Sequence, residues 1–189
     1  MTPLAAAPPP PAPLPLISAA EFMARYENVR AELVKGIVKE LPMPETEHGK
    51  ICITIGALIY NYAKAHDVGH VMGNDTWIRT GIDTIRGGDV LFVNYERLPR
   101  GKVTPGILSI APDLVVEVRS PSDRWTEMFT KVIEYLKAGV RVVVVLDPKS
   151  ETASVYRDDE FQQIFHNGDP LTIPDVLPGF SVAVNELFM

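Results

Sequence analysis

Two acidic residues stand in segments that otherwise have the pattern of buried strands. Glu117 interrupts the run Leu-Val-Val-Glu-Val at 114–118, and Asp89 opens the run Asp-Val-Leu-Phe-Val at 89–93. Burying a carboxylate is costly unless it pairs with a cation or binds a metal. If the two strands are neighbours, their carboxylates repel each other, and an ion that prefers oxygen ligands, Mg²⁺ or Mn²⁺, relieves that repulsion. Asp89 and Glu117 therefore indicate a metal site suited to hydrolysis.

Each of these residues also has a purely structural interpretation. Asp89 can cap a turn, and Glu117 can form a buried ion pair with a nearby Arg or Lys. Asp113 lies four residues before Glu117, so the strand period of two places both on one face and makes Asp113 a further candidate metal ligand. Because it follows Pro112 at the start of the strand, Asp113 can equally serve to accept backbone hydrogen bonds.

Two basic residues are candidates for catalysis beside the carboxylates. Arg119 shares the face of Glu117, and its guanidinium can hold a phosphate but cannot act as a base. Lys131 lies in the helix expected after this strand. Either it forms an exposed pair with Glu127, four residues earlier, or its ammonium reaches back to the carboxylates. There it can orient a water molecule or neutralise charge that develops on a phosphate.

Other catalytic motifs are missing from the sequence. It has no Gly-rich nucleotide-binding loop and no Gly-x-Ser-x-Gly elbow. The single cysteine, Cys52, excludes an intramolecular disulfide and a zinc site built from clustered cysteines. The four histidines have no metal-ligand spacing as a set and are expected at the surface. His48, however, begins a predicted long helix beside Glu47, and either residue can face a site at that helix's N-terminus.

The elements that must position these residues alternate between helix and strand. Ser18 and Glu21 form a capping box for a helix to about residue 26, and a hairpin turns near Lys35 and Gly36. A long amphipathic helix spans 46–66, and a second runs from about 124 to 138, capped by residues 120–123 and ended by Gly139. Predicted strands lie at 68–72, 76–80, 89–93, 114–118 and 140–146, with a hairpin at 153–156 and 161–165, turns at Gly73, Gly81, Gly87 and Gly88, and a C-terminal tail. The pattern predicts a mixed α/β (α+β) fold with helices against a central sheet and additional hairpins.

Composition narrows the class of protein further. The chain has 189 residues, 46% of them hydrophobic, and a formal net charge of -6. This charge argues against a polybasic nucleic-acid binder, although basic residues outnumber acidic ones between residues 97 and 141. No run is long enough to span a membrane and no signal peptide is visible, so we expect a cytoplasmic protein. Residues 1–16 form a Pro/Ala-rich tail, expected to be solvated or to dock into a partner's aromatic groove, and 17–189 form one domain.

Several motifs together resemble a known family. They are Pro-Asp-Leu-Val-Val-Glu-Val-x-Ser-Pro-Ser at 112–122, Lys131-x3-Tyr135-x3-Gly139-Val140, and the valine-rich strand ending in Asp147-Pro148. Weaker matches are Ala-Glu-Leu-Val-x-Gly at 31–36 and Leu-Pro-Gly-Phe at 177–180. This set resembles the Uma2 (DUF820) family, which is grouped with the restriction endonucleases of the PD-(D/E)XK superfamily. The resemblance covers residues 17–188.

The resemblance implies a restriction-endonuclease-like core with a mixed sheet, and a Mg²⁺- or Mn²⁺-dependent endonuclease that hydrolyses DNA. Because cutting two strands is easiest with two sites, we expect a homodimer. Asp89 matches the first acidic residue of the superfamily motif, Glu117 the second and Lys131 the lysine. Gly88 replaces the usual proline and Arg119 the nominal lysine, which moves the lysine's role to Lys131 or weakens the site. Two alternatives stay open: a catalytically degenerate binding module with the nuclease fold, and a hydrolase of another phosphate substrate.

Overall fold

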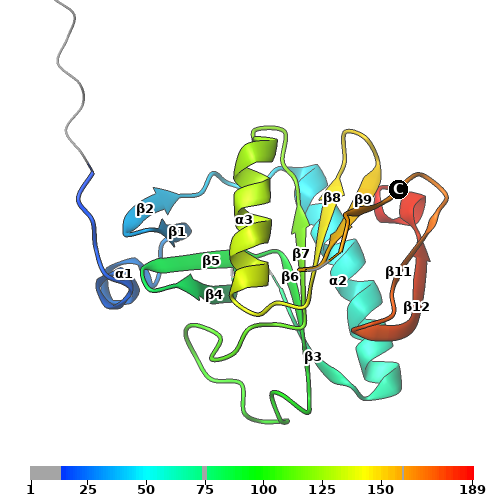
Figure 1. The fold of residues 1–189 in the computed structure, drawn as a ribbon, viewed down its shortest axis with the longest axis horizontal. Helices are drawn as coiled ribbons and strands as arrows, with labels where there is room; N and C mark the ends of the chain where they lie inside the picture. The colour runs from blue at the N-terminus through cyan, green and yellow to red at the C-terminus, as the bar shows by residue number, and fades with distance from the viewer. Residues whose placement is uncertain (1–13, 74–75, 159) are drawn as a thin grey trace, which may run out of the picture.

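The computed structural model describes residues 14–73, 76–158 and 160–189, so most of the Pro/Ala-rich tail lies outside the described residues. Its largest element is a six-stranded sheet (Figure 1). Neighbouring strands are antiparallel except β7 and β8, which are parallel and are joined by helix α3 (Trp125–Lys137). The strand order is β10 (Gln163–Phe165), β9 (Thr152–Tyr156), β8 (Val142–Asp147), β7 (Leu114–Val118), β6 (Val90–Asn94) and β3 (Gly69–Met72).

The two faces of this sheet are covered by different helices (Figure 1). Helix α2 (Thr46–His66) packs Ile51, Ile55 and Ile59 against one face, where Val116 of β7 also points. Helix α3 covers the other face, to which Val115 contributes. Because side chains alternate along a strand, Glu117 shares the face of Val115 and points toward α3. The prediction of a buried, valine-rich strand is confirmed, since every residue of β8 is buried.

A second sheet of four strands lies beside the first and holds a strand that the sequence pattern did not predict. Its order is β2 (Ile37–Glu40), β1 (Ala31–Val34), β5 (Thr84–Gly88) and β4 (Thr76–Gly81), and helix α1 (Ala19–Tyr26) packs on it. The turns expected at Gly87 and Gly88 are wrong, because both glycines belong to β5. A Cβ at Gly88 would lie 2.5 Å from the end of the Leu91 side chain, so a larger residue there would displace Leu91. The chain passes from β5 through Asp89 into β6, so Asp89 lies where the two sheets meet.

The predicted N-terminal elements are confirmed. Ser18 and Glu21 form the capping box of α1, and Lys35 and Gly36 turn the β1–β2 hairpin with positive φ angles of 51° and 80°. The cap predicted for α3 is wrong: the N-cap is Arg124 without a side-chain bond, and Asp123 instead accepts a hydrogen bond from the backbone N–H of Ser120.

The C-terminal residues form structure where a tail was expected. They make a hairpin of β11 (Pro170–Ile173) and β12 (Leu177–Ala183), followed by the 3₁₀ helix η1 (Val184–Leu187). Leu171, Leu177 and Leu187 are fully buried in the core that α2 shares with the large sheet. Among the described residues, no helix has the length and apolar character needed to cross a membrane.

Candidate active site

Asp89 and Glu117 come together where β5 passes into β6, beside the end of β7. The pairing of β6 with β7 ends with Val90 opposite Val116; Asp89 directly precedes Val90, and its carboxylate accepts a hydrogen bond from the backbone N–H of Val118, the residue after Glu117. Both carboxylates line a pocket of about 350 Å³, together with Lys131 of α3 and Glu32 of β1. Three residues singled out from the sequence, Asp89, Glu117 and Lys131, therefore meet at one site. Asp89 and Lys131 are 42 positions apart in the chain.

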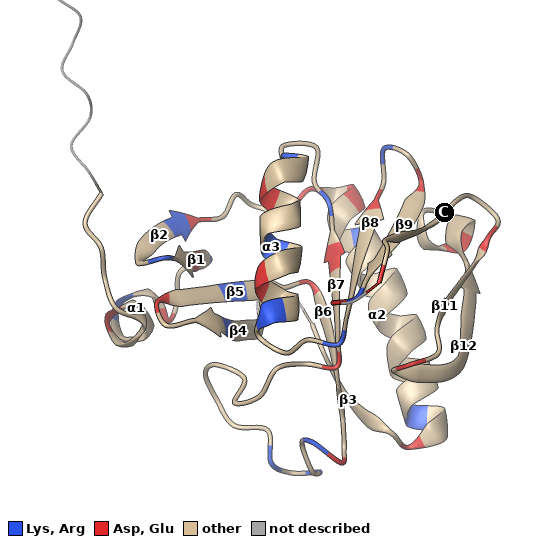
Figure 2. Ribbon diagram, in the orientation of Figure 1, with Lys and Arg blue, Asp and Glu red and all other residues tan. Residues whose placement is uncertain are grey.

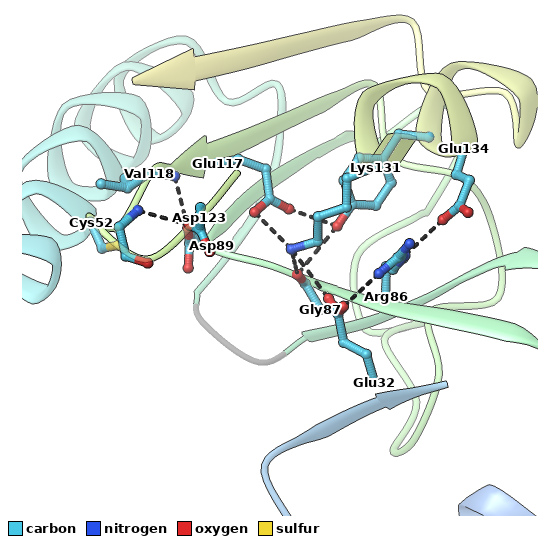
Figure 3. A network of polar contacts seen from close by, with 12 residues as sticks. Glu32, Cys52, Arg86, Gly87, Asp89, Glu117, Val118, Asp123, Lys131 and Glu134 are labelled. Atoms are coloured by element: carbon cyan, nitrogen blue, oxygen red, sulfur yellow. Dashed lines mark hydrogen bonds and ion pairs between the residues drawn. The ribbon is translucent and has the colours of Figure 1, made fainter. Parts of the chain in front are cut away.

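Glu117 is buried and has a hydrogen-bond donor at each carboxylate oxygen (Figure 3). Its Oε2 accepts a hydrogen bond from Lys131 Nζ at 2.9 Å, and its Oε1 accepts one from the Tyr135 hydroxyl at 2.7 Å. Burial raises the pKa of Glu117 to about 7, and the charge of Asp89 adds to this rise although Lys131 and Tyr135 oppose it. Glu117 is thus poised between its protonated and ionised forms at neutral pH.

Lys131 faces the carboxylates, and its expected alternative pairing with Glu127 is replaced by two buried ion pairs. Its Nζ lies 2.9 Å from Glu117 Oε2 and 3.2 Å from Glu32 Oε1, and it donates to the carbonyl of Gly87 at 3.2 Å. Burial alone would lower the pKa of Lys131, but Glu117, Glu32 and Asp89 together raise it above its ordinary value. Lys131 therefore carries its charge at neutral pH and acts as a hydrogen-bond donor.

Glu32 is a member of the site that the sequence reasoning did not identify. It is 3% exposed and also pairs with Arg86, whose Nη1 lies 2.8 Å from Glu32 Oε2 and whose Nε lies 2.7 Å from Glu134 (Figure 3). Burial would raise the pKa of Glu32, but Lys131 and Arg86 lower it below the ordinary value. The available signal was the same as for Glu117: an acid between apolar residues in a predicted strand, Ala-Glu-Leu-Val.

Asp89 is held from the α2 side of the site. Its Oδ2 accepts a hydrogen bond from the Val118 backbone N–H at 2.8 Å and lies 3.3 Å from His48 Nε2. Burial would raise the pKa of Asp89, but His48, Lys131 and the Val118 N–H together lower it below its ordinary value. The hydrogen bond to Asp89 in turn raises the pKa of His48. His48 thus faces the site from the first turn of α2. Its other ring nitrogen lies 3.4 Å from the Cys52 sulfur, and burial raises the pKa of that thiol.

The structure does not bring Arg119 and Asp113 to this pocket. Arg119 lies 3.1 Å from Asp147, donates to the Asp123 carbonyl and stacks over Trp125. Asp113 is buried at the opposite end of β7. There it accepts hydrogen bonds from the Asn94 backbone and from Arg97 Nη1, each at 2.8 Å. The backbone-accepting interpretation of Asp113 is thereby the one observed.

Comparisons with known proteins identify the family and the fold. Residues 19–185 match the model of the family Uma2, described as "Putative restriction endonuclease". The fold matches a crystal structure described as a "putative nuclease belonging to DUF820 from Anabaena variabilis ATCC 29413" with a TM-score of 0.82. That match has 24% sequence identity and covers 91% of this chain and 97% of the other, so it establishes the shared fold. No match was found among curated proteins.

Proposed function

The chain belongs to the Uma2 family of restriction-endonuclease-like nucleases, and we propose that it is a metal-dependent endonuclease that hydrolyses the phosphodiester bonds of DNA. The observation that carries this proposal is the meeting of Asp89, Glu117 and Lys131 in one pocket. Two carboxylates beside a permanently charged ammonium form a site that attracts a cation and also tolerates a phosphate.

The donor set fits the metal that the proposal requires. Asp89 and Glu117 offer carboxylate oxygens, which Mg²⁺ and Mn²⁺ prefer. Each oxygen of Glu117 accepts one hydrogen bond in the structure, which leaves it a further lone pair. Asp89 and Glu117 would hold the ion, which when bound polarises the scissile phosphate and lowers the pKa of an attacking water.

The remaining residues of the site would position and neutralise charge. Lys131 keeps its proton at neutral pH, so it would donate a hydrogen bond to a phosphate oxygen or to the attacking water. Tyr135 donates to Glu117 and thereby fixes the orientation of that carboxylate. Glu32 holds the Lys131 ammonium from the β1 side and is assigned as a positioning residue.

The basic groups near the pocket would serve the approach of DNA. Along α3 basic and acidic residues alternate, whereas the one charged residue of β5, Arg86, is buried and paired with Glu32 and Glu134 (Figure 2). Arg30 and Lys39 also line the pocket. The net charge of -6 opposes strong non-specific binding, so the proposal rests on local contacts and the bound cation for phosphate affinity. A homodimer, which would let two sites cut two strands, remains a prediction.

One observation favours the alternative of a catalytically degenerate binding module. Both oxygens of Glu117 already have partners, Lys131 and Tyr135, so the network is satisfied by protein groups alone. The third possibility, hydrolysis of another phosphate substrate, uses the same residues and differs only in what enters the pocket.

The decisive experiment compares DNA cleavage by the wild type, Glu117→Gln and Glu127→Gln, with Mg²⁺ or Mn²⁺ present. Glu127 is an exposed acid that lines the same pocket, so its variant removes the same charge without touching the proposed ligands. Losing a metal ligand worth several kcal/mol should slow cleavage at least about 100-fold in Glu117→Gln and leave Glu127→Gln active.

Calorimetry then separates the alternatives. Mn²⁺ titrated into the wild type with a short DNA duplex should release binding heat that disappears in Glu117→Gln. Binding without cleavage of any DNA would point to another phosphate substrate. Neither binding nor cleavage by the wild type would overturn the enzyme proposal in favour of the binding module.

A further inference from the structure

A second set of donor atoms lies on the α2 side of Asp89. His48 and Cys52 are four residues apart in α2, so their side chains leave the same face of the helix. One ligand atom from each of His48, Cys52 and Asp89 can be chosen so that all three lie within 4.8 Å of one another. The function proposed above uses Asp89 and leaves the imidazole and the thiol without a chemical role.

We propose that His48, Cys52 and Asp89 form a binding site for Zn²⁺, and that Zn²⁺ bound there excludes the Mg²⁺ or Mn²⁺ of the neighbouring carboxylate site. The second half rests on the function proposed above, because the two sites would share Asp89. The first half depends only on the three side chains.

The chemistry of the donors selects the metal. A thiolate and an imidazole suit zinc, whereas Mg²⁺ is bound through oxygen. Histidine, cysteine and a carboxylate are three ligand types found at four-coordinate zinc, and three protein ligands leave one position for water or a phosphate oxygen. The site can therefore hold zinc with an open position directed toward the same pocket, which His48 and Asp89 both line.

The geometry brings the three side chains close together and requires a rotation of the His48 ring. Ligand atoms around a tetrahedral zinc lie about 3.4–3.6 Å apart, given the usual metal–ligand bond lengths. The Cys52 sulfur lies 3.4 Å from His48 Nδ1, and Asp89 Oδ2 lies 3.3 Å from His48 Nε2, so both separations already have nearly this size. They involve opposite nitrogens of one ring, and the three ligand atoms lie within 4.8 Å of one another, so the His48 side chain must rotate before a single ion can contact all three residues.

The backbone holds Asp89 and α2 in place for such a site. Asp89 is fixed by the Val118 N–H, and α2 is anchored by Ile51 and Ile55, which are almost fully buried against the sheet. Cys52 itself is partly buried beside them. The ligands therefore lie on rigid elements, which limits the ordering cost of metal binding.

Cobalt is the probe that tests the site, because Co²⁺ replaces zinc and reports a bound thiolate by a charge-transfer band in the near ultraviolet. We expect this band in the wild type and in Glu117→Gln, its disappearance in Cys52→Ser, and its loss or marked weakening in Asp89→Asn. Zinc affinity, measured by competition, should fall at least about 100-fold in Cys52→Ala, since even losing an outer-shell partner costs 10–100-fold. Circular dichroism checks that each variant is folded.

To test whether bound Zn²⁺ excludes Mn²⁺ from the carboxylate site, Mn²⁺ is titrated into the protein with and without one equivalent of Zn²⁺. Zinc should weaken Mn²⁺ binding at least tenfold in the wild type and have no such effect in Cys52→Ser. Absence of the cobalt band in the folded wild type, or its full retention in Asp89→Asn, would overturn the zinc site. Zinc binding that leaves Mn²⁺ affinity unchanged would overturn the sharing of Asp89. If Mn²⁺ fails to bind even without zinc, the proposed function fails, and the cobalt band still decides the zinc site independently.

Discussion

Replacing Glu117 by glutamine should remove most of the change in stability that this protein undergoes between weakly acidic and neutral pH. The pKa of Glu117 is about 7 in the folded protein, against an ordinary value of 4.5 that the unfolded chain is expected to have. The folded state therefore binds this proton more tightly than the unfolded state. The contribution of Glu117 to stability is therefore fully present at pH values below 4.5 and is lost as the pH rises through the folded-state pKa.

The size of the effect follows from the shift. One pKa unit corresponds to 1.36 kcal/mol, so the shift from 4.5 to about 7 implies a loss of roughly 3 kcal/mol of unfolding free energy over that range. His48 acts in the same direction, because its pKa is also raised in the folded state. Asp89 and Glu32 have lowered pKa values, so their contributions are lost only at more acidic pH. Glutamine resembles the protonated carboxyl in shape and charge, so the variant should keep the stability that wild type has only in acid.

The measurement is urea unfolding of metal-free wild type, Glu117→Gln and Glu127→Gln from about pH 5 to about pH 8. We expect wild type and Glu127→Gln to lose stability together as the pH rises, while Glu117→Gln loses only the smaller contribution of His48. A wild-type stability that stays constant or increases over this range would refute the reasoning. So would a parallel loss in Glu117→Gln, because the proton would then belong to another group.

Three further substitutions test other parts of the structure. Lys131→Met should abolish cleavage and lower the unfolding free energy by about 3–5 kcal/mol, because it leaves buried carboxylates unpaired; denaturant titration and a cleavage assay measure both effects. Asp113→Asn should cost about 1–3 kcal/mol of stability yet change Mn²⁺ affinity less than twofold by calorimetry, since Asp113 lies outside the pocket; a large loss of affinity would restore it as a ligand. Gly69→Ala should lower stability by about 1–3 kcal/mol in thermal unfolding, because its Cβ would lie 2.5 Å from the Val93 carbonyl oxygen; an unchanged melting temperature would contradict this.

Much of the fold was predictable because the signals are local. Helix α2 was predicted with its observed bounds, Thr46–His66, because its apolar residues recur at helical spacing. The buried strand β8 was identified from its valines. Strand β5 was missed because Gly87 and Gly88 favour a turn locally. In the tertiary structure both glycines lie in β5, and Gly88 packs closely beside the Leu91 side chain.

The residues of the candidate site were likewise predictable only in part from the sequence. Glu117 and Asp89 were identified from the sequence because an acid in an apolar strand conflicts with burial, and that conflict is visible along the chain. Glu32 has the same signal, yet its partner Lys131 lies about a hundred residues away, and only the packing of β1 beside β5 and α3 reveals the pair. Arg119 was placed by strand alternation, which fails beyond the end of β7, where Asp147 and Trp125 bind the guanidinium.

The sequence by itself determined the elements, the family resemblance and the two carboxylates, since periodicity and misplaced charge are properties of neighbouring residues. Only the tertiary structure decided which side chains meet. The pairing of β6 with β7 brings Asp89 to the end of β7 that holds Glu117, and the packing of α2 brings His48 and Cys52 to Asp89. The packing of α3 then directs Lys131 toward Glu117 and away from Glu127. These are contacts between residues far apart in the chain, and they are fixed by how layers pack, which no local pattern encodes.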